Sequence, residues 1–118
     1  MRWEIAKALS RIGSKKAVHV LVNALEDRDF SVRWIAAEGL ITMGPDSLIP
    51  LLDALDNKPD SVWLREGAHH VLHDLMGREL IDDETVQCVF PVLDALDRMQ
   101  GEMETESAAS KALKMLKK

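Results

Sequence analysis

The chain contains a single cysteine, which excludes an internal disulfide framework and favours a reducing compartment. No apolar run approaches the roughly 18 residues that a membrane-spanning helix needs. The first dozen residues place charged side chains among the apolar ones, which is unlike a secretory signal. We therefore expect a soluble, cytoplasmic protein that has no membrane partner.

Basic residues are also scarce, because 15 Lys and Arg stand against 20 Asp and Glu, a net charge of −5. Proteins that bind nucleic-acid phosphates normally carry the opposite balance, so we expect no nucleic-acid partner. The 118 residues are 47% hydrophobic and 4% aromatic, which is enough for one buried core but leaves no room for two. We therefore expect residues 1–118 to form one domain.

An internal repeat is the main positive signal in this chain. Each copy reads Arg, two variable residues, two small or apolar residues, a variable residue, a small or apolar residue and Leu. Copies of this first template occupy 2–9, 33–40 and 65–72, with a degraded copy, in which Glu replaces Arg, at 106–113. Copies of a second template lie between them, at 17–26, 47–56 and 88–97.

Both templates carry the apolar stripe of an amphipathic helix, as in Val18, Leu21, Val22 and Leu25, which are spaced i, i+3, i+4, i+7. No stretch alternates with the period of two that is typical of strands. We expect helices near 2–12, 15–26, 31–43, 46–56, 61–76, 84–99 and 104–117. We also expect a half repeat at 1–13 and full repeats near 14–44, 45–77 and 78–118.

The segments between the expected helices contain turn and capping residues. Asp29 and Ser61 can accept hydrogen bonds from the first N–H groups of a helix, and Gly44 stands where a helix ends in a left-handed residue. The last repeat contains an insertion of roughly ten residues across 74–84, with Gly77 and Asp82 among its loop signals.

A single helix pair cannot cover its own apolar stripe, whereas stacking on a neighbouring pair does. Small residues such as Ala36, Ala37 and Ala68 allow adjacent helices to approach to about 8–10 Å. The pattern therefore predicts an all-α fold, an α-α superhelix or α-solenoid of about three and a half helix-pair repeats.

The Val-Arg-x-x-Ala-Ala-x-x-Leu helix at 32–40, with an apolar helix preceding it, resembles a HEAT repeat, and more narrowly the HEAT-like repeats of the phycobilisome lyase type. The resemblance covers nearly the whole chain and is weakest over 74–86 and 99–107. It implies a ladder between repeats, formed by Asp after the first helix and Arg at the second. Asp27 and Arg33 match these places.

The resemblance also implies that the Arg-bearing helices line a concave face, where three rows of variable residues align. The rows are Trp3, Trp34, Glu66, Ser107; Lys7, Glu38, His70, Lys111; and Arg11, Thr42, Asp74, Met115. Aromatic residues in a charged surround make good interface anchors. We therefore expect a partner-binding site composed of Trp3, Trp34, Glu38, Glu66, His70 and Asp74. The alternative is that the tryptophans pack inside the stack, as we expect for Trp63.

The histidine-rich segment around His69, His70 and His73 could hold a metal ion, because His69 and His73 share one helix face and Glu66 and His70 share another. A single site would have to draw on two faces, so we expect structural or surface histidines and no metal or cofactor. Deoxyhypusine hydroxylase has similar repeats and binds iron through His-Glu pairs directly after the repeat Arg. None of the four corresponding pairs here is His-Glu, which argues against that activity.

Cys88 stands near a helix start, where a thiol can be activated, but the sequence supplies no base for it. No nucleophile elbow, Gly-rich phosphate loop or paired-Cys motif is present. We therefore expect a non-enzymatic scaffold that binds another protein through its concave face.

The alternative function is an accessory subunit to an enzyme, such as a bilin lyase-like helper, in which Trp3, Trp34 and His70 would contact the ligand. The chain also begins in an Arg-type helix without its partner helix. We expect either a longer natural chain or self-association through this uncapped helix.

Overall fold

The computed structural model describes residues 15–58, 60–97 and 102–117, which form six α-helices and one 3-10 helix without any strand. The elements are α2 (Lys15–Ala24), α3 (Phe30–Met43), η1 (Gly44–Ser47), α4 (Leu48–Asn57), α5 (Val62–Gly77), α6 (Asp83–Asp97) and α7 (Glu102–Leu116). The predicted all-α fold is therefore confirmed. The helix expected near 2–12 lies outside the described residues.

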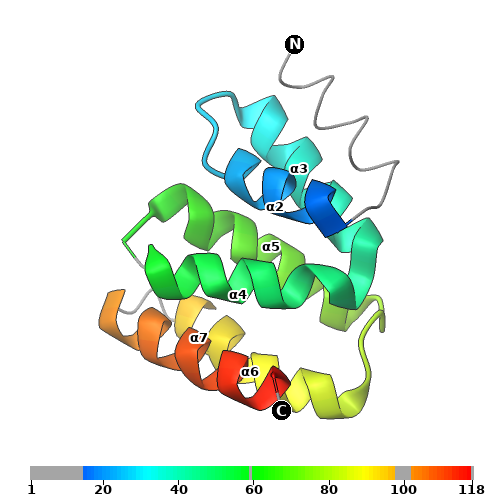
Figure 1. The fold of residues 1–118 in the computed structure, drawn as a ribbon, viewed down its shortest axis with the longest axis vertical. Helices are drawn as coiled ribbons and strands as arrows, with labels where there is room; N and C mark the ends of the chain where they lie inside the picture. Colours follow the sequence, from blue (N-terminus) through cyan, green and yellow to red (C-terminus); the bar gives the residue numbers. More distant parts are fainter. Residues whose placement is uncertain (1–14, 59, 98–101, 118) are drawn as a thin grey trace.

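The first two described helix pairs stack as a HEAT-like solenoid does. Helix α3 packs against α2 within its pair and against α5 of the next pair, while α2 contacts α4 (Figure 1). One layer of the solenoid therefore contains α3 and α5, and the other contains α2 and α4.

In the last pair, the first and second helices have exchanged layers. Helix α6 packs against α5, and α7 packs against both α4 and α6 (Figure 1). A regular third repeat would instead place its first helix beside α4 and its second beside α5. The predicted rows are therefore wrong at their last position, because Lys111 and Met115 lie on a helix in the layer of α2 and α4.

The two connections between pairs differ in backbone conformation. Gly44 ends α3 with φ 65° and ψ −136°, which favours glycine, and the 3-10 helix carries the chain directly into α4. After α5, the left-handed residue is Glu79, with φ 57°. The N–H of Leu80 donates to the carbonyl of Leu75 at 3.0 Å, and that of Glu79 to Met76 at 3.2 Å, as in a Schellman motif.

The helices expected near 61–76 and 84–99 are confirmed, and the insertion across 74–84 contains only a short connection between them. Helix α5 continues through Gly77 and α6 begins at Asp83, so residues 78–82 alone connect them. The core explains this, because Leu75 and Ile81 on either side of the turn are both buried. The glycine ends a helix rather than occupying a loop.

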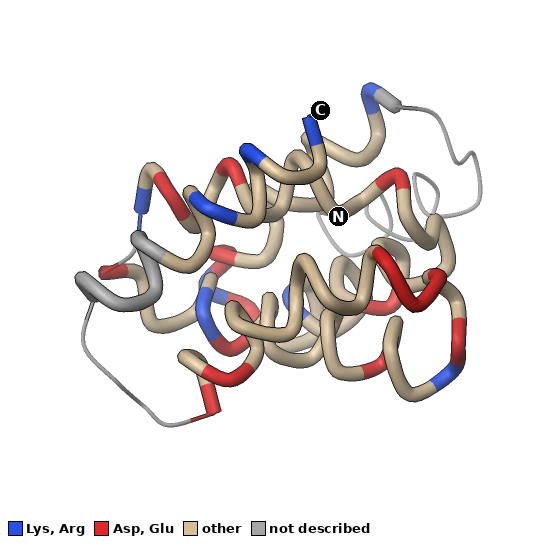
Figure 2. The backbone as a smooth tube through the Cα atoms, turned by 90° about the horizontal axis from the view of Figure 1, so that it is seen from below, with Lys and Arg blue, Asp and Glu red and all other residues tan. Residues whose placement is uncertain are grey.

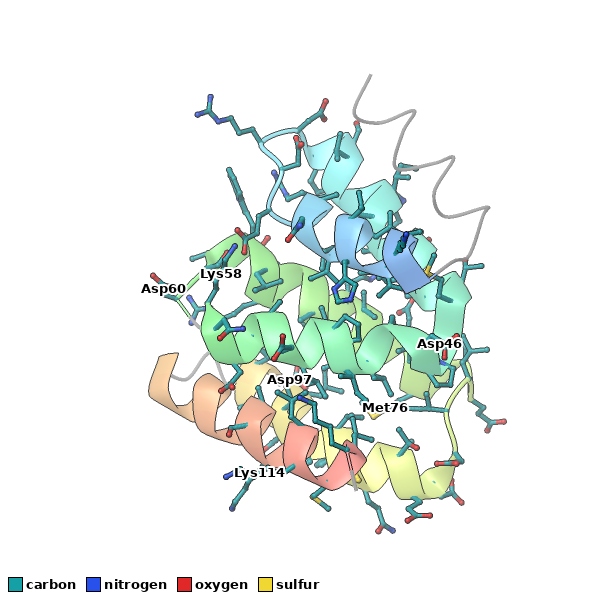
Figure 3. The ribbon with its side chains drawn as sticks, in the orientation of Figure 1. Asp46, Lys58, Asp60, Met76, Asp97 and Lys114 are labelled. Carbon is teal, nitrogen blue, oxygen red and sulfur yellow. The ribbon has the colours of Figure 1, made fainter. Side chains whose placement is uncertain are left out.

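The core is built from the predicted apolar stripes. Leu21, Leu25, Leu51 and Leu55 are fully buried, and each such side chain stabilises the fold by about 1.5–3 kcal/mol. Met76, labelled in Figure 3, is partly buried against this core.

Small residues bring the helices close together, as the sequence predicts. Ala36 on α3 and Ala68 on α5 have no exposed surface. A Cβ placed on Gly67 would lie 2.9 Å from Cδ2 of Leu25, so α5 approaches this leucine as closely as glycine allows. The spacing of the solenoid therefore depends on these small side chains.

One helical stretch, Phe30–Asn57, is long and apolar enough to cross a membrane by length and composition. It consists of α3, η1 and α4, and the positive φ of Gly44 bends it. Since 56% of its most apolar window is buried inside the molecule, its apolar residues form the core of the solenoid.

Polar side chains cap the helices as expected. Asp29 accepts a hydrogen bond from the N–H of Ser31 at 2.9 Å, and Ser61 accepts one from Leu64 at 3.2 Å. Lys114 lies in the last turn of α7, where positive charge complements the helix dipole (Figure 3). Figure 2 shows blue segments of Lys and Arg near the C-terminal end of the chain. Lys58, at the end of α4, pairs with Glu26 at 3.6 Å (Figure 3).

Replacing Glu79 by glycine should raise the free energy of unfolding by about 0.5–1 kcal/mol, because glycine adopts positive φ without the Cβ penalty. Urea unfolding followed by circular dichroism measures this difference. Asp60→Gly is the matched control, since Asp60 is an exposed loop residue without positive φ. Equal destabilisation by both substitutions would contradict the assigned turn.

Asp82 caps α6. Its carboxylate accepts hydrogen bonds from the hydroxyl and from the main-chain N–H of Thr85, and these bonds lower the pKa of Asp82. A lowered pKa stabilises the fold above the unfolded value of about 4, and this stabilisation disappears as pH falls through the lower folded value. We expect Asp82→Asn to be less stable than the wild type at pH 5–7, with the difference shrinking below about pH 4. Urea titrations across this range test it, and a difference that is independent of pH would contradict it.

Candidate functional site

The α3 and α5 helices bring together most of the residues predicted to bind a partner. Trp34 and Glu38 lie one turn apart on α3, and Glu66, His70 and Asp74 follow at successive turns on α5. The Trp34 and His70 rings stack, with their centroids 5.0 Å apart and an interplanar angle of 24°. His70 Nε2 lies 3.7 Å from Glu38 Oε2. The two helices are therefore in the register that the repeat predicted.

The two other predicted residues are Trp3 and Glu66. Trp3 lies outside the described residues, as do Lys7 and Arg11 of the same predicted rows. Glu66 is exposed on α5, one turn before His70.

An aromatic row extends the site toward the start of α3. Phe30 stacks on Trp34 with a centroid distance of 6.5 Å, so three rings follow one another from Phe30 to His70. Phe30 is 67% exposed and Trp34 is 48% exposed, which is unusual for side chains this apolar. The sequence analysis missed Phe30, although its position three residues before the repeat Arg was visible.

Arg33 connects this row to Trp63. Its guanidinium lies 5.5 Å from the centroid of the Phe30 ring and 4.6 Å from that of Trp63. Such cation–π contacts contribute about 0.5–1 kcal/mol each at exposed sites. We expected Trp63 to be a packing residue, but its side chain is 40% exposed and belongs to the same surface.

Arg33 also anchors the loop before α3. It donates hydrogen bonds to the main-chain carbonyls of Asp27 at 2.8 Å and Arg28 at 3.2 Å. The carboxylate of Asp27 accepts from the N–H of Asp29 at 2.9 Å. The expected partnership of Asp27 and Arg33 thus uses a carbonyl oxygen as its acceptor.

A charged cluster lies at the other end of the site. Arg78 donates to Asp74 at 2.9 Å and approaches Glu38 at 4.0 Å, so it connects α5 to α3. His73 Nδ1 lies 3.5 Å from Asp74. His70 Nε2 is buried and has no hydrogen-bond partner among the described residues, and a buried unpaired polar atom costs about 1–3 kcal/mol. Sequence reasoning missed Arg78 because no repeat template contains it.

His69 contacts α6. His69 Nε2 pairs with Asp97 at 2.5 Å, and Asp97 lies at the end of α6 (Figure 3). The rings of His69 and His73 stack at 5.9 Å. As predicted, the histidines of this segment use two faces of the helix.

We name the exposed part of this region the α3–α5 surface. It comprises Phe30, Arg33, Trp34, Glu38, Trp63, Glu66, His70, Asp74 and Arg78.

The stacking of Trp34 on His70 should appear as a coupling free energy. In a double-mutant cycle of Trp34→Ala and His70→Ala, we expect about 0.5–1.5 kcal/mol of coupling in the free energy of unfolding. Urea unfolding of the four proteins measures it. A matched cycle of Phe90→Ala with His70→Ala should be additive, because Phe90 is an exposed ring on α6. Additivity in the first cycle would contradict the stack.

Comparison with known proteins assigns the family. A profile of HEAT repeats matches residues 1–72, and the chain therefore belongs to the HEAT repeat family. The chain is also 42% identical over 55 residues to the phycocyanobilin lyase subunit alpha of Picosynechococcus sp.. That match covers 47% of this chain and 20% of the lyase subunit, so the chain spans about a fifth of its relative's length. The predicted resemblance to repeats of the phycobilisome lyase type is confirmed. No solved structure matches the chain.

Proposed function

We propose that this HEAT-repeat protein is a non-enzymatic interaction module that binds another protein through the α3–α5 surface. The observation that carries the proposal is the stacked row of Phe30, Trp34 and His70, whose first two members are strongly exposed. Tryptophan and arginine are the residues that most often dominate the binding energy of protein interfaces. Here they lie together with a second tryptophan, Trp63.

The contacts within this surface hold its anchor in place before a partner arrives. Trp34 lies between the rings of Phe30 and His70, and Arg33 lies against Trp63 and Phe30. A side chain that is already ordered loses less conformational entropy on binding. This preorganisation supports binding by the surface as it stands.

The charges of the surface define the partner's chemistry. Glu38, Glu66 and Asp74 provide three carboxylates, of which Arg78 partly neutralises two. A partner segment with an apolar side chain for Trp34 and a basic side chain for Glu66 would complement this arrangement. The proposed partner is therefore a protein with an apolar and basic patch.

The proposal includes no chemistry of the chain's own. HEAT repeats are generally non-catalytic. Cys88, the lone thiol, is half-buried on α6 and lies on a different helix from the α3–α5 surface. We place the protein in the cytoplasm on its single cysteine. Self-association through the helix expected near 2–12 stays a prediction, since that segment is outside the described residues.

A second candidate is an accessory role for an enzyme that acts on a bilin. It is supported by the partial identity to a phycocyanobilin lyase subunit and by the aromatic row, on which a conjugated ring system could stack. This role predicts a bound chromophore, whereas the scaffold role predicts none.

Affinity capture from the native cell extract tests the first proposal. The wild type should retain a stoichiometric protein, and the Trp34→Ala, Glu38→Lys variant should lose at least about nine-tenths of it, since hot-spot residues contribute 2 kcal/mol or more. Phe90→Ala is the matched control, because it removes an exposed ring from α6 and should retain the partner. Mass spectrometry identifies and quantifies the captured protein.

The absorbance spectrum of the same eluate separates the two candidates. A visible pigment without stoichiometric protein would favour the accessory role. Equal capture by the wild type and the double variant would contradict binding through the α3–α5 surface, provided that circular dichroism shows both to be folded.

A further inference from the structure

We propose that Glu38, His70 and Asp74 form a binding site for a divalent transition metal between α3 and α5. Each residue offers one ligand atom, and these atoms lie within 4.8 Å of one another. From the sequence we expected no metal, since the histidine segment of one helix did not offer a single site. In the structure, Glu38 of the preceding repeat adds the third ligand to His70 and Asp74. The site goes beyond the proposed function, since it needs no protein partner.

The strongest argument is the unpaired nitrogen of His70. Its Nε2 atom is buried, has no hydrogen-bond partner within residues 15–58, 60–97 and 102–117, and faces Glu38 Oε2 at 3.7 Å. A metal ion would satisfy this nitrogen without a proton. Stacking on Trp34 fixes the plane of the imidazole, which is the positioning that metal ligands usually receive from neighbouring groups.

The geometry of the three residues matches a small, open metal site. His70 and Asp74 are spaced i, i+4 on α5 and so project from one face of the helix, while Glu38 reaches them from α3. One imidazole and two carboxylates suit Zn²⁺, Co²⁺ or Mn²⁺. Ligand distances of about 2.0–2.2 Å require the donor atoms to approach one another by roughly 1 Å. All three side chains are partly exposed and can make this shift.

Arg78 would compete with such a metal ion for the two carboxylates. Its guanidinium lies 2.9 Å from Asp74 and 4.0 Å from Glu38, so it contacts both carboxylates of the site. The Arg78 side chain is 55% exposed and can move into solvent when a cation replaces it. The site therefore exchanges one positive charge for another, and removing Arg78 should strengthen metal binding.

Calorimetric titration of the purified, tag-free chain with Zn²⁺, and visible spectroscopy with Co²⁺, test this site. We expect one equivalent to bind to the wild type, at least a tenfold loss of affinity in His70→Ala and in His70→Gln, and an increase of about fivefold in Arg78→Ala. The His70→Gln variant keeps a polar side chain of similar length, so the loss does not depend on a cavity. Circular dichroism confirms that each variant is folded.

The matched control is the double variant His69→Ala, His73→Ala, which removes the other pair of histidines from the same helix. It should bind the metal as the wild type does. Loss of binding in this control with retention in His70→Ala, or no stoichiometric binding to the wild type, would overturn the proposal. Because no partner takes part, this result is independent of the capture experiment.

Discussion

The close packing of α3 on α5 is the constraint on which the rest of the structure depends. It requires small side chains, and Ala36 on α3 and Ala68 on α5 are fully buried. At this separation, Trp34 reaches His70 across the boundary between two repeats. The aromatic row and the charged cluster therefore both follow from the small residues of the repeat template.

Much of this arrangement could be predicted from the sequence because it follows from periodicity. The apolar stripes define the helices, and the offset of 32 residues between Arg33 and Arg65 places Trp34 and Glu38 beside Glu66 and His70. Helix capping at Asp29 and Ser61 was equally local, since each cap involves residues two or three positions apart. Register and capping are therefore accessible without a structure.

Other features depend on single side chains or dihedral angles that no template contains. The guanidinium of Arg33 lies against two aromatic rings, and that of Arg78 contacts two carboxylates, because each long side chain adopts one conformation among many. The exchanged order of α6 and α7 follows a turn in which Glu79 has a positive φ. A glutamate does not predict a positive φ, whereas the glycine at position 44 does.

The exchanged order of the last pair bears on how such an array can lengthen. Duplicating a pair such as α4–α5 would join like layers to like, so the new unit would continue the same superhelix. A copy of α4–α5 joined after α7 would meet first and second helices in reversed places. Duplication of an interior pair is therefore compatible with the layers of this solenoid, whereas a unit added beside α6–α7 would have to match the exchanged order of that pair.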